Sequence, residues 1–393
     1  MLTFTALRDR TLRLFTLACV ILAIFTVCTL PALAAKDRTF LDFSLEFLGE
    51  YQLPKTTFEG TPVSGLSAIT YDPQGTTTFP SPSFRFYALS DDRSAYAPAR
   101  FYTLRLDLAP PGSTGIQKVA VEAVTYLTDS EGQPFPWSTL NPEGLSLSPR
   151  NSVFVASEGI TSQGIAPFIR EFDLKTGKQR SDLPIPSRYL PDTPDEKQQQ
   201  GVVNNLGFES LTLDPESFSP GGRDPFRLFT AVESPLVQDR DAEATKVRLL
   251  HYVIADRSPY LVSEHLYTLD PGPWTLLNGL TELVAIGKGG HFLSLERSFG
   301  LSGYKAKVFQ VAVGGATDTS RIASLKGPLT NVEPVKKKLL LDFSDLGIPL
   351  YNLEGMTLGP RLPDGSQSLL LVSDDNFDRA QKTQFLLFRL KSN

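Results

Sequence analysis

Cysteine and histidine are scarce in this sequence. Among 393 residues there are two cysteines and three histidines. Both cysteines, Cys19 and Cys28, fall within the first 35 residues, so a chain without that segment has neither disulfides nor a thiol nucleophile. The histidines, His251, His265 and His291, lack the spacing of zinc ligands and are too few for an ordinary Ser-His-Asp hydrolase. We therefore expect them to be structural.

Other features are also missing, and each excludes a class of protein. After residue 35 no apolar run approaches the roughly 20 residues of a membrane-spanning helix. The formal net charge is −5, so the surface does not attract nucleic acid. Gly-x-Ser-x-Gly, Walker-type, dinucleotide-binding and His-Glu-x-x-His motifs are absent from the sequence. We expect a monomer that binds a small molecule. After removal of its first 35 residues, we expect the chain not to bind a membrane.

The N-terminus has the three-part layout of a secretory signal peptide. Three arginines at 8–13 precede an uninterrupted apolar stretch at 14–30, and small residues follow it. We predict a cleaved signal peptide at 1–35 and a single domain at 36–393, located in the periplasm or outside the cell. An uncleaved membrane anchor is the alternative, because the apolar stretch is about 17 residues long.

What the sequence does contain is a repeat of β-strand patterns. Short alternating apolar runs that begin with an acidic or small polar residue recur five times, about 70 residues apart. Each is followed by a second β-rich run that ends in an acid, and then by a third run with period-two alternation. The first runs lie at 64–69, 143–147, 209–213, 282–286 and 354–358, and the third at 101–108, 168–174, 247–254, 307–313 and 384–390. Such self-similarity indicates a repeat architecture.

The repeat predicts an all-β fold, a β-propeller with five blades. A weaker fourth strand is predicted at 119–127, 179–185, 261–269 and 320–325, and long loops at 187–205, 214–226 and 326–338. The last unit ends before its fourth strand, and an unmatched strand at 45–51 can supply it and close the ring. A sixth blade could lie within 314–350, where 339–343 has the pattern of a strand. A pair of β-sandwiches is the alternative fold.

Acidic residues recur where first strands begin and second strands end. In a propeller blade the first strand lines the central channel and the second runs antiparallel beside it, so these positions meet at one mouth. Carboxylates about 8 Å apart repel by roughly 2 kcal/mol at an effective dielectric near 20, so the cluster needs positive charge. Bound Ca²⁺, with Mg²⁺ as second choice, and nearby arginines can supply it. The predicted metal ligands are Asp91, Glu143, Glu209, Glu282, Glu354 and Asp374, and the predicted substrate-binding residues are Arg93, Arg297 and Arg379.

Other residues of the same pattern leave two interpretations open. The acids at second-strand ends also include Glu158, Glu233 and Glu296. Asparagines precede the acids at Asn141, Asn205, Asn278 and Asn352. Their amides can supply oxygen ligands or form turns. The carboxylates, likewise, can bind a cation or cap backbone amides and hold neighbouring blades in register.

Several strings within the repeat are distinctive. They include Leu-Ser-Asp-Asp-Arg at 89–93, Asn-Pro-Glu-Gly-Leu at 141–145, Asn-Leu-Glu-Gly-Met at 352–356 and Ser-Asp-Asp-Asn-Phe at 373–377. In these strings the chain resembles the family named for the esterase-like activity of phytase, a propeller domain of exported bacterial proteins. The resemblance covers about 45–390. It implies phosphoester or ester hydrolysis, and similar propeller phytases use carboxylate-held Ca²⁺ to bind phosphate and activate water.

The matching strings single out four candidate catalytic residues, which are Asp92, Glu143, Glu354 and Asp375. Three functions remain in competition. The first is a metal-assisted phosphoester hydrolase at the acidic channel mouth. The second is a non-catalytic propeller that binds a ligand or protein outside the cytoplasm. The third is a lactonase or esterase on the same scaffold.

Overall fold

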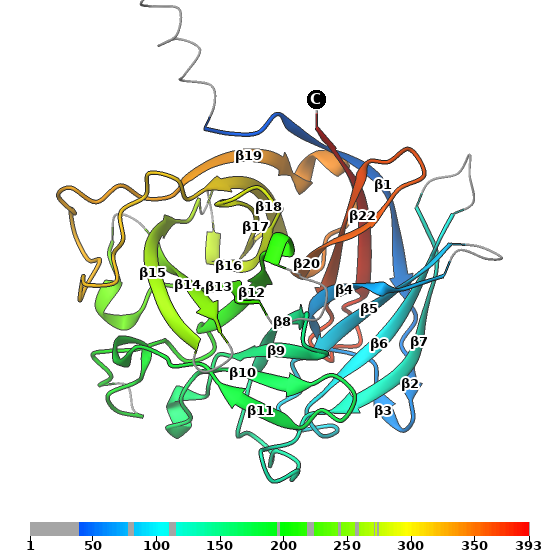
Figure 1. Cartoon of the computed structure of the whole chain (residues 1–393), viewed down its shortest axis with the longest axis horizontal. Helices are drawn as coiled ribbons and strands as arrows, with labels where there is room; N and C mark the ends of the chain where they lie inside the picture. The colour runs from blue at the N-terminus through cyan, green and yellow to red at the C-terminus, as the bar shows by residue number, and fades with distance from the viewer. Residues whose placement is uncertain are drawn as a thin grey trace, which may run out of the picture. The chain divides into compact units, whose positions relative to one another are not determined.

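Alternating apolar residues form antiparallel strands along the chain, as the computed structural model shows (Figure 1). The structure describes residues 39–77, 82–109, 115–194, 197–217, 224–242, 245–255, 259–270, 272 and 275–392. The predicted signal peptide at 1–35 lies outside the described residues, as does 218–223 of a predicted loop. None of the helices in the described part of the chain is long and apolar enough to span a bilayer.

The described strands form five four-stranded antiparallel sheets, which are the blades of a β-propeller. Blade 1 contains β4 (Leu66–Thr77), β5 (Ser83–Ser90), β6 (Arg100–Leu108) and β7 (Ile116–Tyr126). Blade 2 contains β8 (Pro142–Ser148), β9 (Ser152–Ser157), β10 (Phe168–Asp173) and β11 (Gln179–Asp182). Blade 3 contains β12 (Phe208–Leu213), β13 (Phe226–Val232), β14 (Lys246–Ile254) and β15 (Pro259–Thr268).

The last two blades complete the ring. Blade 4 contains β16 (Thr275–Ala285), β17 (His291–Gly300), β18 (Gly303–Ala312) and β19 (Lys336–Asp342). Blade 5 contains β20 (Asn352–Arg361), β21 (Gln367–Asp374), β22 (Thr383–Ser392) and, from the other end of the chain, β1 (Phe43–Leu53). β1 pairs antiparallel with β22, with Leu45 opposite Leu390 and Tyr51 opposite Phe385. The predicted closure by the N-terminal strand is therefore confirmed.

The remaining described elements are short. A two-stranded hairpin joins β2 (Thr57–Phe58) to β3 (Thr61–Pro62). The 3-10 helices are η1 (Thr161–Gln163), η2 (Ser187–Tyr189), η3 (Pro215–Ser217), η4 (Val237–Asp239) and η5 (Phe343–Leu346). The apolar core lies between blades, and each first strand, β4, β8, β12, β16 or β20, contacts the first strand of the next blade.

The prediction of a strand at 320–325 is wrong. That stretch contains turns, and its backbone bonds to buried side chains of blade 3: Arg248 donates to the Ile322 carbonyl at 3.1 Å, and the Leu325 amide donates to Asp239 at 2.7 Å. The fourth strand of blade 4 is instead β19, which pairs with β18. The apolar run at 339–343 therefore belongs to blade 4 and to no sixth blade, and 336–338 is part of a strand where a loop was predicted.

Candidate functional site

Every first strand contains a β-bulge at the same level of the channel. The register shifts across one extra residue in β4, β8, β12, β16 and β20. A bulge inserts an unpaired residue and re-aims its side chain, and bulges are frequent beside active sites. The five extra residues are Ser67, Glu143, Glu209, Thr281 and Glu354. The repeat thus places three of the predicted acids at equivalent positions.

A second ring of equivalent residues lies on or directly after the second strands, each one residue beyond the partner of the residue that precedes the bulge. These residues are Asp91, Glu158, Glu233, Arg297 and Asp374. Four blades supply an acid and blade 4 supplies an arginine. Together with the bulge acids, this gives seven carboxyl groups at one mouth of the channel, which we call the acidic mouth; six of them are buried and Asp91 is partly exposed.

Arg297 is the cation in direct contact with these acids. Its guanidinium lies 3.1 Å from a Glu233 oxygen, 3.2 Å from Glu354 and 3.7 Å from Glu209. Arg93 is more peripheral: it donates to the Asn141 amide oxygen at 2.7 Å and also to Asn205. Among the described residues, one arginine thus faces three carboxyl groups, so the acids in direct contact outnumber the cations.

Three carboxyl groups come close enough to share one cation. Oxygen atoms of Glu158, Glu209 and Glu233 all lie within 4.8 Å of one another. Glu158 also accepts from the Gly207 amide at 2.6 Å and from the Asn141 side chain at 2.7 Å, which fixes its carboxylate. Glu209 was predicted as a ligand; Glu158 and Glu233 were predicted at the same mouth but not as ligands.

Burial and mutual repulsion raise the pKa values of the acidic mouth. Burial, followed by the charge of Glu233, raises the pKa of Glu158 to about 8. Burial raises the pKa of Asp374 to about 7. Burial is also the largest cause for Glu209 and Glu354, whose pKa values lie well above the ordinary range. These groups therefore favour the protonated form more than ordinary carboxyl groups do, and a bound cation could take the place of the protons.

Unsatisfied polar atoms remain at this mouth, and they test whether the residues fit a cation. Asp91 Oδ1 and Asn352 Oδ1 are buried with no hydrogen-bond partner among the described residues. The Asn352 amide nitrogen meanwhile donates to Glu354 at 2.7 Å, which leaves the amide oxygen facing away from a donor. An all-oxygen donor set with orphaned acceptors fits a hard cation such as Ca²⁺.

Two glycines make room for the acids. A Cβ atom on Gly65 would overlap the Asp91 carboxylate and the Phe377 ring, and one on Gly279 would overlap the Glu233 carboxylate. Gly65 also has a φ of 64°, which a residue with a side chain rarely adopts. The backbone can therefore approach the carboxylates of Asp91 and Glu233 closely because Gly65 and Gly279 have no side chain.

Asp92 and Asp375, two predicted catalytic residues, have other contacts. Asp92 accepts from the amides of Ala95, Tyr96 and Ala97 and forms an ion pair of 2.7 Å with Arg100, and both charged side chains are fully buried. It holds the loop after β5 in place and does not belong to the acidic mouth.

Asp375 has a similar anchoring set. It accepts from Lys55, from the Ser64 hydroxyl, from the Gly65 amide at 2.9 Å and from the Thr383 hydroxyl at 3.0 Å. Burial opposes ionisation, but Lys55 and Ser64 outweigh it and lower the pKa of Asp375. Consecutive residues point to opposite sides of a strand, so the second acid of each Asp-Asp pair turns away from the channel.

Between them these two acids position an aromatic pair beside the acidic mouth. Asp92 fixes the Tyr96 amide and Asp375 that of Phe377, and the two rings stack with centroids 4.6 Å apart. Phe377 has a φ of 53°, an unusual conformation for a bulky residue. Positive φ values at Ser94, Ser138 and Asn376 also fall in loops at this mouth. Clustered backbone strain of this kind is typical of functional sites.

Glu282 differs from the other first-strand acids. It follows the bulge residue Thr281, so it is equivalent to Gly144 and Gly355 and not to Glu143 or Glu354. Its carboxylate accepts from its own neighbour Leu283 at 2.9 Å and from Leu211 of blade 3 at 3.1 Å. Burial raises its pKa well above the ordinary range. Glu282 therefore bonds to backbone amides of the channel wall.

The remaining predicted residues lie outside the direct contacts of the cluster. Arg379 is exposed in the loop after β21. Glu296 accepts from Tyr267 at 2.6 Å, from the Asp270 amide at 2.7 Å and from Lys337. The structure thus brings together Asp91, Glu143, Glu209, Glu354 and Asp374 of the predicted ligands, with Glu143 and Glu354 also among the predicted catalytic residues.

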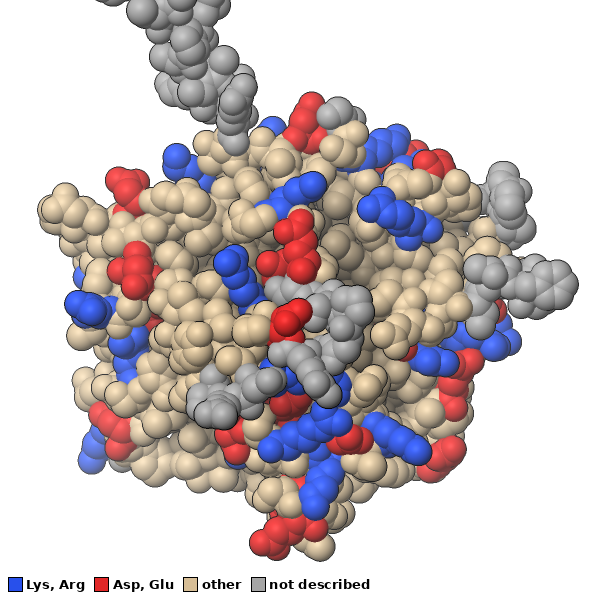
Figure 2. All heavy atoms as spheres, viewed as in Figure 1, with Lys and Arg blue, Asp and Glu red and all other residues tan. Residues whose placement is uncertain are grey.

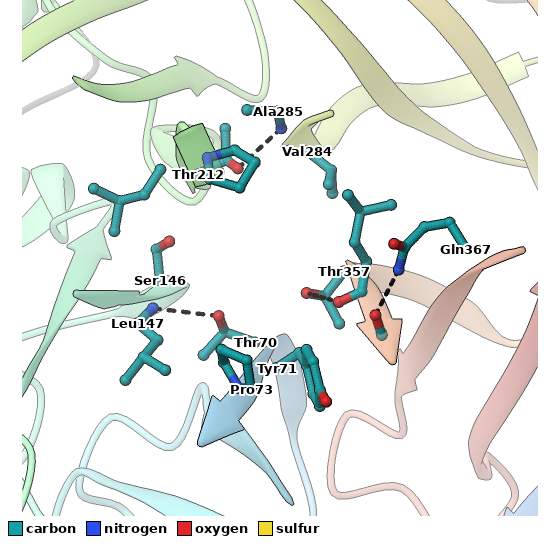
Figure 3. A pocket seen from close by; sticks show the side chains of 14 residues that line it. Thr70, Tyr71, Pro73, Ser146, Leu147, Thr212, Val284, Ala285, Thr357 and Gln367 are labelled. Carbon is teal, nitrogen blue, oxygen red and sulfur yellow. Dashed lines mark hydrogen bonds between the residues drawn. The ribbon is translucent and has the colours of Figure 1, made fainter. Parts of the chain in front are cut away.

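The pocket at the opposite end of the channel has no charged side chain among its described lining residues. Its volume is about 330 Å³, and it is lined by the ends of the first strands. Figure 3 shows Thr70, Ser146, Thr212 and Thr357 around it, with Val284 at the fifth equivalent position. The Leu147 and Ala285 amides donate across to Thr70 and Thr212, at 3.2 and 3.1 Å, so the hydroxyls also join neighbouring blades. This pocket holds no titratable group suited to hydrolysis.

One face of the molecule shows no strong charge preference. Lysine, arginine, aspartate and glutamate side chains are interspersed on the face seen in Figure 2. This face therefore has no extended patch of one sign that would attract a polyanion.

Comparison with known proteins gives a family but no curated relative. No curated protein matches the sequence. Similar solved structures include the Dos1 propeller (8% identity, TM-score 0.32, covering 88% of this chain and 95% of that one). Another is a thermostable family-43 glycoside hydrolase (10% identity, TM-score 0.40, covering 87% and 93%). A third is an α-L-arabinofuranosidase of Podospora anserina in complex with cellotriose (9% identity, TM-score 0.40, covering 90% and 98%).

A family model also matches most of the chain. It is the Phytase-like model, described as "Esterase-like activity of phytase", and it matches residues 61–377, from the hairpin before β4 to the strained loop after β21. That span includes all seven carboxyl groups of the acidic mouth and Arg297. The chain belongs to this phytase-like family of β-propellers.

Proposed function

We propose that this propeller is an exported, Ca²⁺-dependent hydrolase of phosphoesters or esters, and that the acidic mouth is its active site. One observation carries the proposal: Glu158, Glu209 and Glu233 bring three buried carboxylates within 4.8 Å, beyond what a single arginine neutralises. Membership of the phytase-like family supports a hydrolase. The proposal that the protein is exported rests on the predicted signal peptide. We further propose that its substrate is a small molecule and that the protein is a monomer.

The three glutamates are the residues that would hold the cation. When bound, Ca²⁺ would polarise a substrate oxygen and make a neighbouring water more acidic. The chain itself supplies the fixed ligand positions, because Glu158 is anchored by Gly207 and Asn141. Mg²⁺ is the second choice, since it demands a more regular octahedral site.

Glu143 is the best candidate for a general base. Its side chain has no hydrogen-bond or ion-pair partner among the described residues, and burial with the charge of Asp91 raises its pKa well above the ordinary range. A raised pKa makes the ionised carboxylate a stronger base toward the attacking water. The water oxygen would bond to the phosphorus or acyl carbon as the bond from that atom to the leaving oxygen breaks, and the proton that Glu143 takes from the water would pass to the leaving oxygen. Arg93, at the edge of the cluster, would hold the negative charge of the substrate.

The test is hydrolysis of an aryl phosphate and an aryl ester by the purified mature chain, with Ca²⁺, with Mg²⁺ and with chelator. We expect turnover that requires Ca²⁺ and that falls about 10²–10⁴-fold in Glu143→Gln, the usual contribution of a general base. Glu209→Gln should weaken Ca²⁺ binding, whereas Glu131→Gln, a change at an exposed loop residue, should leave both unaffected. Turnover of the ester alone would identify the lactonase or esterase alternative, and equal turnover in chelator would reject the cation site.

A non-catalytic binding propeller is the second candidate. It is favoured by the contacts of Asp92 and Asp375. The carboxylates of these two residues anchor loops, so neither of them is free to take part in catalysis. In that case the purified protein would bind Ca²⁺ without hydrolysing any of the substrates.

A further inference from the structure

A pocket opens onto the acidic mouth between blades 3 and 4. Its volume is about 370 Å³, and its lining includes Glu233 and Arg297 of the cluster. The other walls come from the loop around Asn205 and from Leu276–Asn278 at the start of β16. A bound molecule would therefore contact the cluster on one side and the pocket on the other.

Two buried donors in this pocket have no acceptor. The Asn278 Nδ2 and the Arg297 Nε atoms are buried and make no hydrogen bond with the described residues. Leaving a buried donor unsatisfied is unfavourable, and more so for a charged group. Both donors border the same pocket, so an oxygen acceptor placed there would satisfy them.

The opposite wall is apolar and exposed. Leu276 and Leu277 are 68% and 53% exposed although they are neighbours in a strand. The register of β16 shifts between Thr275 and Leu277, so a bulge lets both side chains remain uncovered. Pro235 and Leu206 extend this apolar surface.

We propose that this pocket binds the substrate beside the acidic mouth, and that the substrate is a phosphoester carrying an apolar group of several carbons. The inference rests on the proposed function, because it assigns the reaction to the acidic mouth. Phosphoryl oxygens accept from Asn278 and Arg297, and the apolar group lies against Leu276 and Leu277. Glu233 and the other acids disfavour a substrate with many phosphates, so a polyphosphorylated polyol should bind poorly.

The test uses alkylphosphonates, which mimic the phosphoester but do not hydrolyse. Titration calorimetry in Ca²⁺ would compare methyl-, butyl- and hexylphosphonate with inositol hexakisphosphate. We expect affinity to rise with chain length, by at most about fourfold per methylene, which corresponds to about 0.8 kcal/mol. Equal affinities for methyl- and hexylphosphonate, or tighter binding of the hexakisphosphate, would overturn the inference.

Variants assign the effect to the pocket. Leu276→Ala combined with Leu277→Ala should remove most of the chain-length dependence, and Asn278→Ala should weaken all phosphonates about equally. Leu301→Ala, which truncates a leucine that is 87% exposed outside the pocket, is the matched control. Unchanged chain-length dependence in the double variant, with wild-type thermal melting, would place the site elsewhere. Because no turnover is measured, failure of hydrolysis would reject the proposed function but leave this result standing.

Discussion

Arg297 occupies the position that holds an acid in each of the other four blades. It is the one residue by which blade 4 departs from the second-strand ring, and it contacts Glu209, Glu233 and Glu354. Its place could be predicted only in part from the sequence. The repeat put an arginine next to the acids, but its equivalence to Asp91 and Asp374 depends on the bulge in β16.

We predict that Arg297→Gln is strongly destabilising. Removing one partner of a buried ion pair leaves uncompensated charge and costs about 3–5 kcal/mol. Urea unfolding at pH 8 in chelator would measure this loss. The loss should be smaller at pH 5, because the raised pKa values of Glu209, Glu233 and Glu354 favour their neutral forms as the pH falls. A loss that is equal at pH 5 and pH 8 would mean that packing, and not charge, is responsible.

The structure also leads to a prediction for Asp92 and Asp375. Asp92→Asn breaks a fully buried ion pair with Arg100, so we expect a loss of about 3–5 kcal/mol in the free energy of unfolding. Asp375→Asn should cost less, because its partner Lys55 is 42% exposed. Turnover per folded molecule should stay within a fewfold of wild type. Asp345→Asn, at an exposed turn residue, is the control. Wild-type stability with lost turnover would instead restore these acids to the chemistry.

These two acids show where prediction from sequence ends. Alternation along a strand predicts that neighbours face opposite ways, but not which of two adjacent aspartates faces the channel. Glu143, Glu209 and Glu354 were found because they recur at equivalent positions. Glu282 was aligned with them because an extra residue in a bulge is invisible in the sequence.

At the scale of elements, most strands follow from alternation and turn residues. The runs at 101–108 and 168–174 correspond to β6 and β10, because apolar residues at every second position face the core between blades. The stretch 320–325 has a similar composition, but Arg248 and Asp239 take up its backbone groups. These side chains are far away in sequence, so a local pattern of residues cannot predict that they bind backbone groups that would otherwise pair in a strand.

The strand most open to test is β1. Deleting 36–52 removes nearly all of it and leaves the backbone of β22 exposed at the edge of blade 5. Exposed edges pair with other chains, so we expect aggregation and loss of a cooperative melting transition. Light scattering and calorimetry would measure both. A truncated protein that is monodisperse and melts like the full domain would show that ring closure is dispensable.

At the scale of the whole molecule, the acidic mouth should control how stability depends on pH. Glu158 and Asp374 have pKa values raised to about 8 and about 7, so the folded state keeps protons that the unfolded chain has released. The free energy of unfolding then falls as the pH rises from the ordinary pKa values of these carboxyl groups to their raised values of about 7 and about 8. His251 acts in the opposite sense, because burial lowers its pKa from 6.5 to about 4, but its contribution is complete above pH 6.5.

We therefore predict that, in chelator, the melting temperature falls between pH 6.5 and pH 8. Saturating Ca²⁺ should cancel the fall, because the cation replaces the protons: at one hundred times its dissociation constant it adds about 2.7 kcal/mol. Calorimetry across this range, with and without Ca²⁺, makes the measurement. A flat profile in chelator would mean that internal pairing already neutralises the cluster.

The pairing of β1 with β22 also means that the ring can close only after nearly the whole chain has been synthesised. Leu45 is among the first described residues to leave the ribosome and Leu390 among the last, about 345 residues later. At translation rates of about 5–20 residues per second, roughly 20–70 seconds separate the two. Throughout that interval the ring is open and β1 has no partner. Chaperones and proteases therefore act on a chain whose ring is still open. We expect resistance to proteolysis to develop only after β22 has been synthesised and has paired with β1.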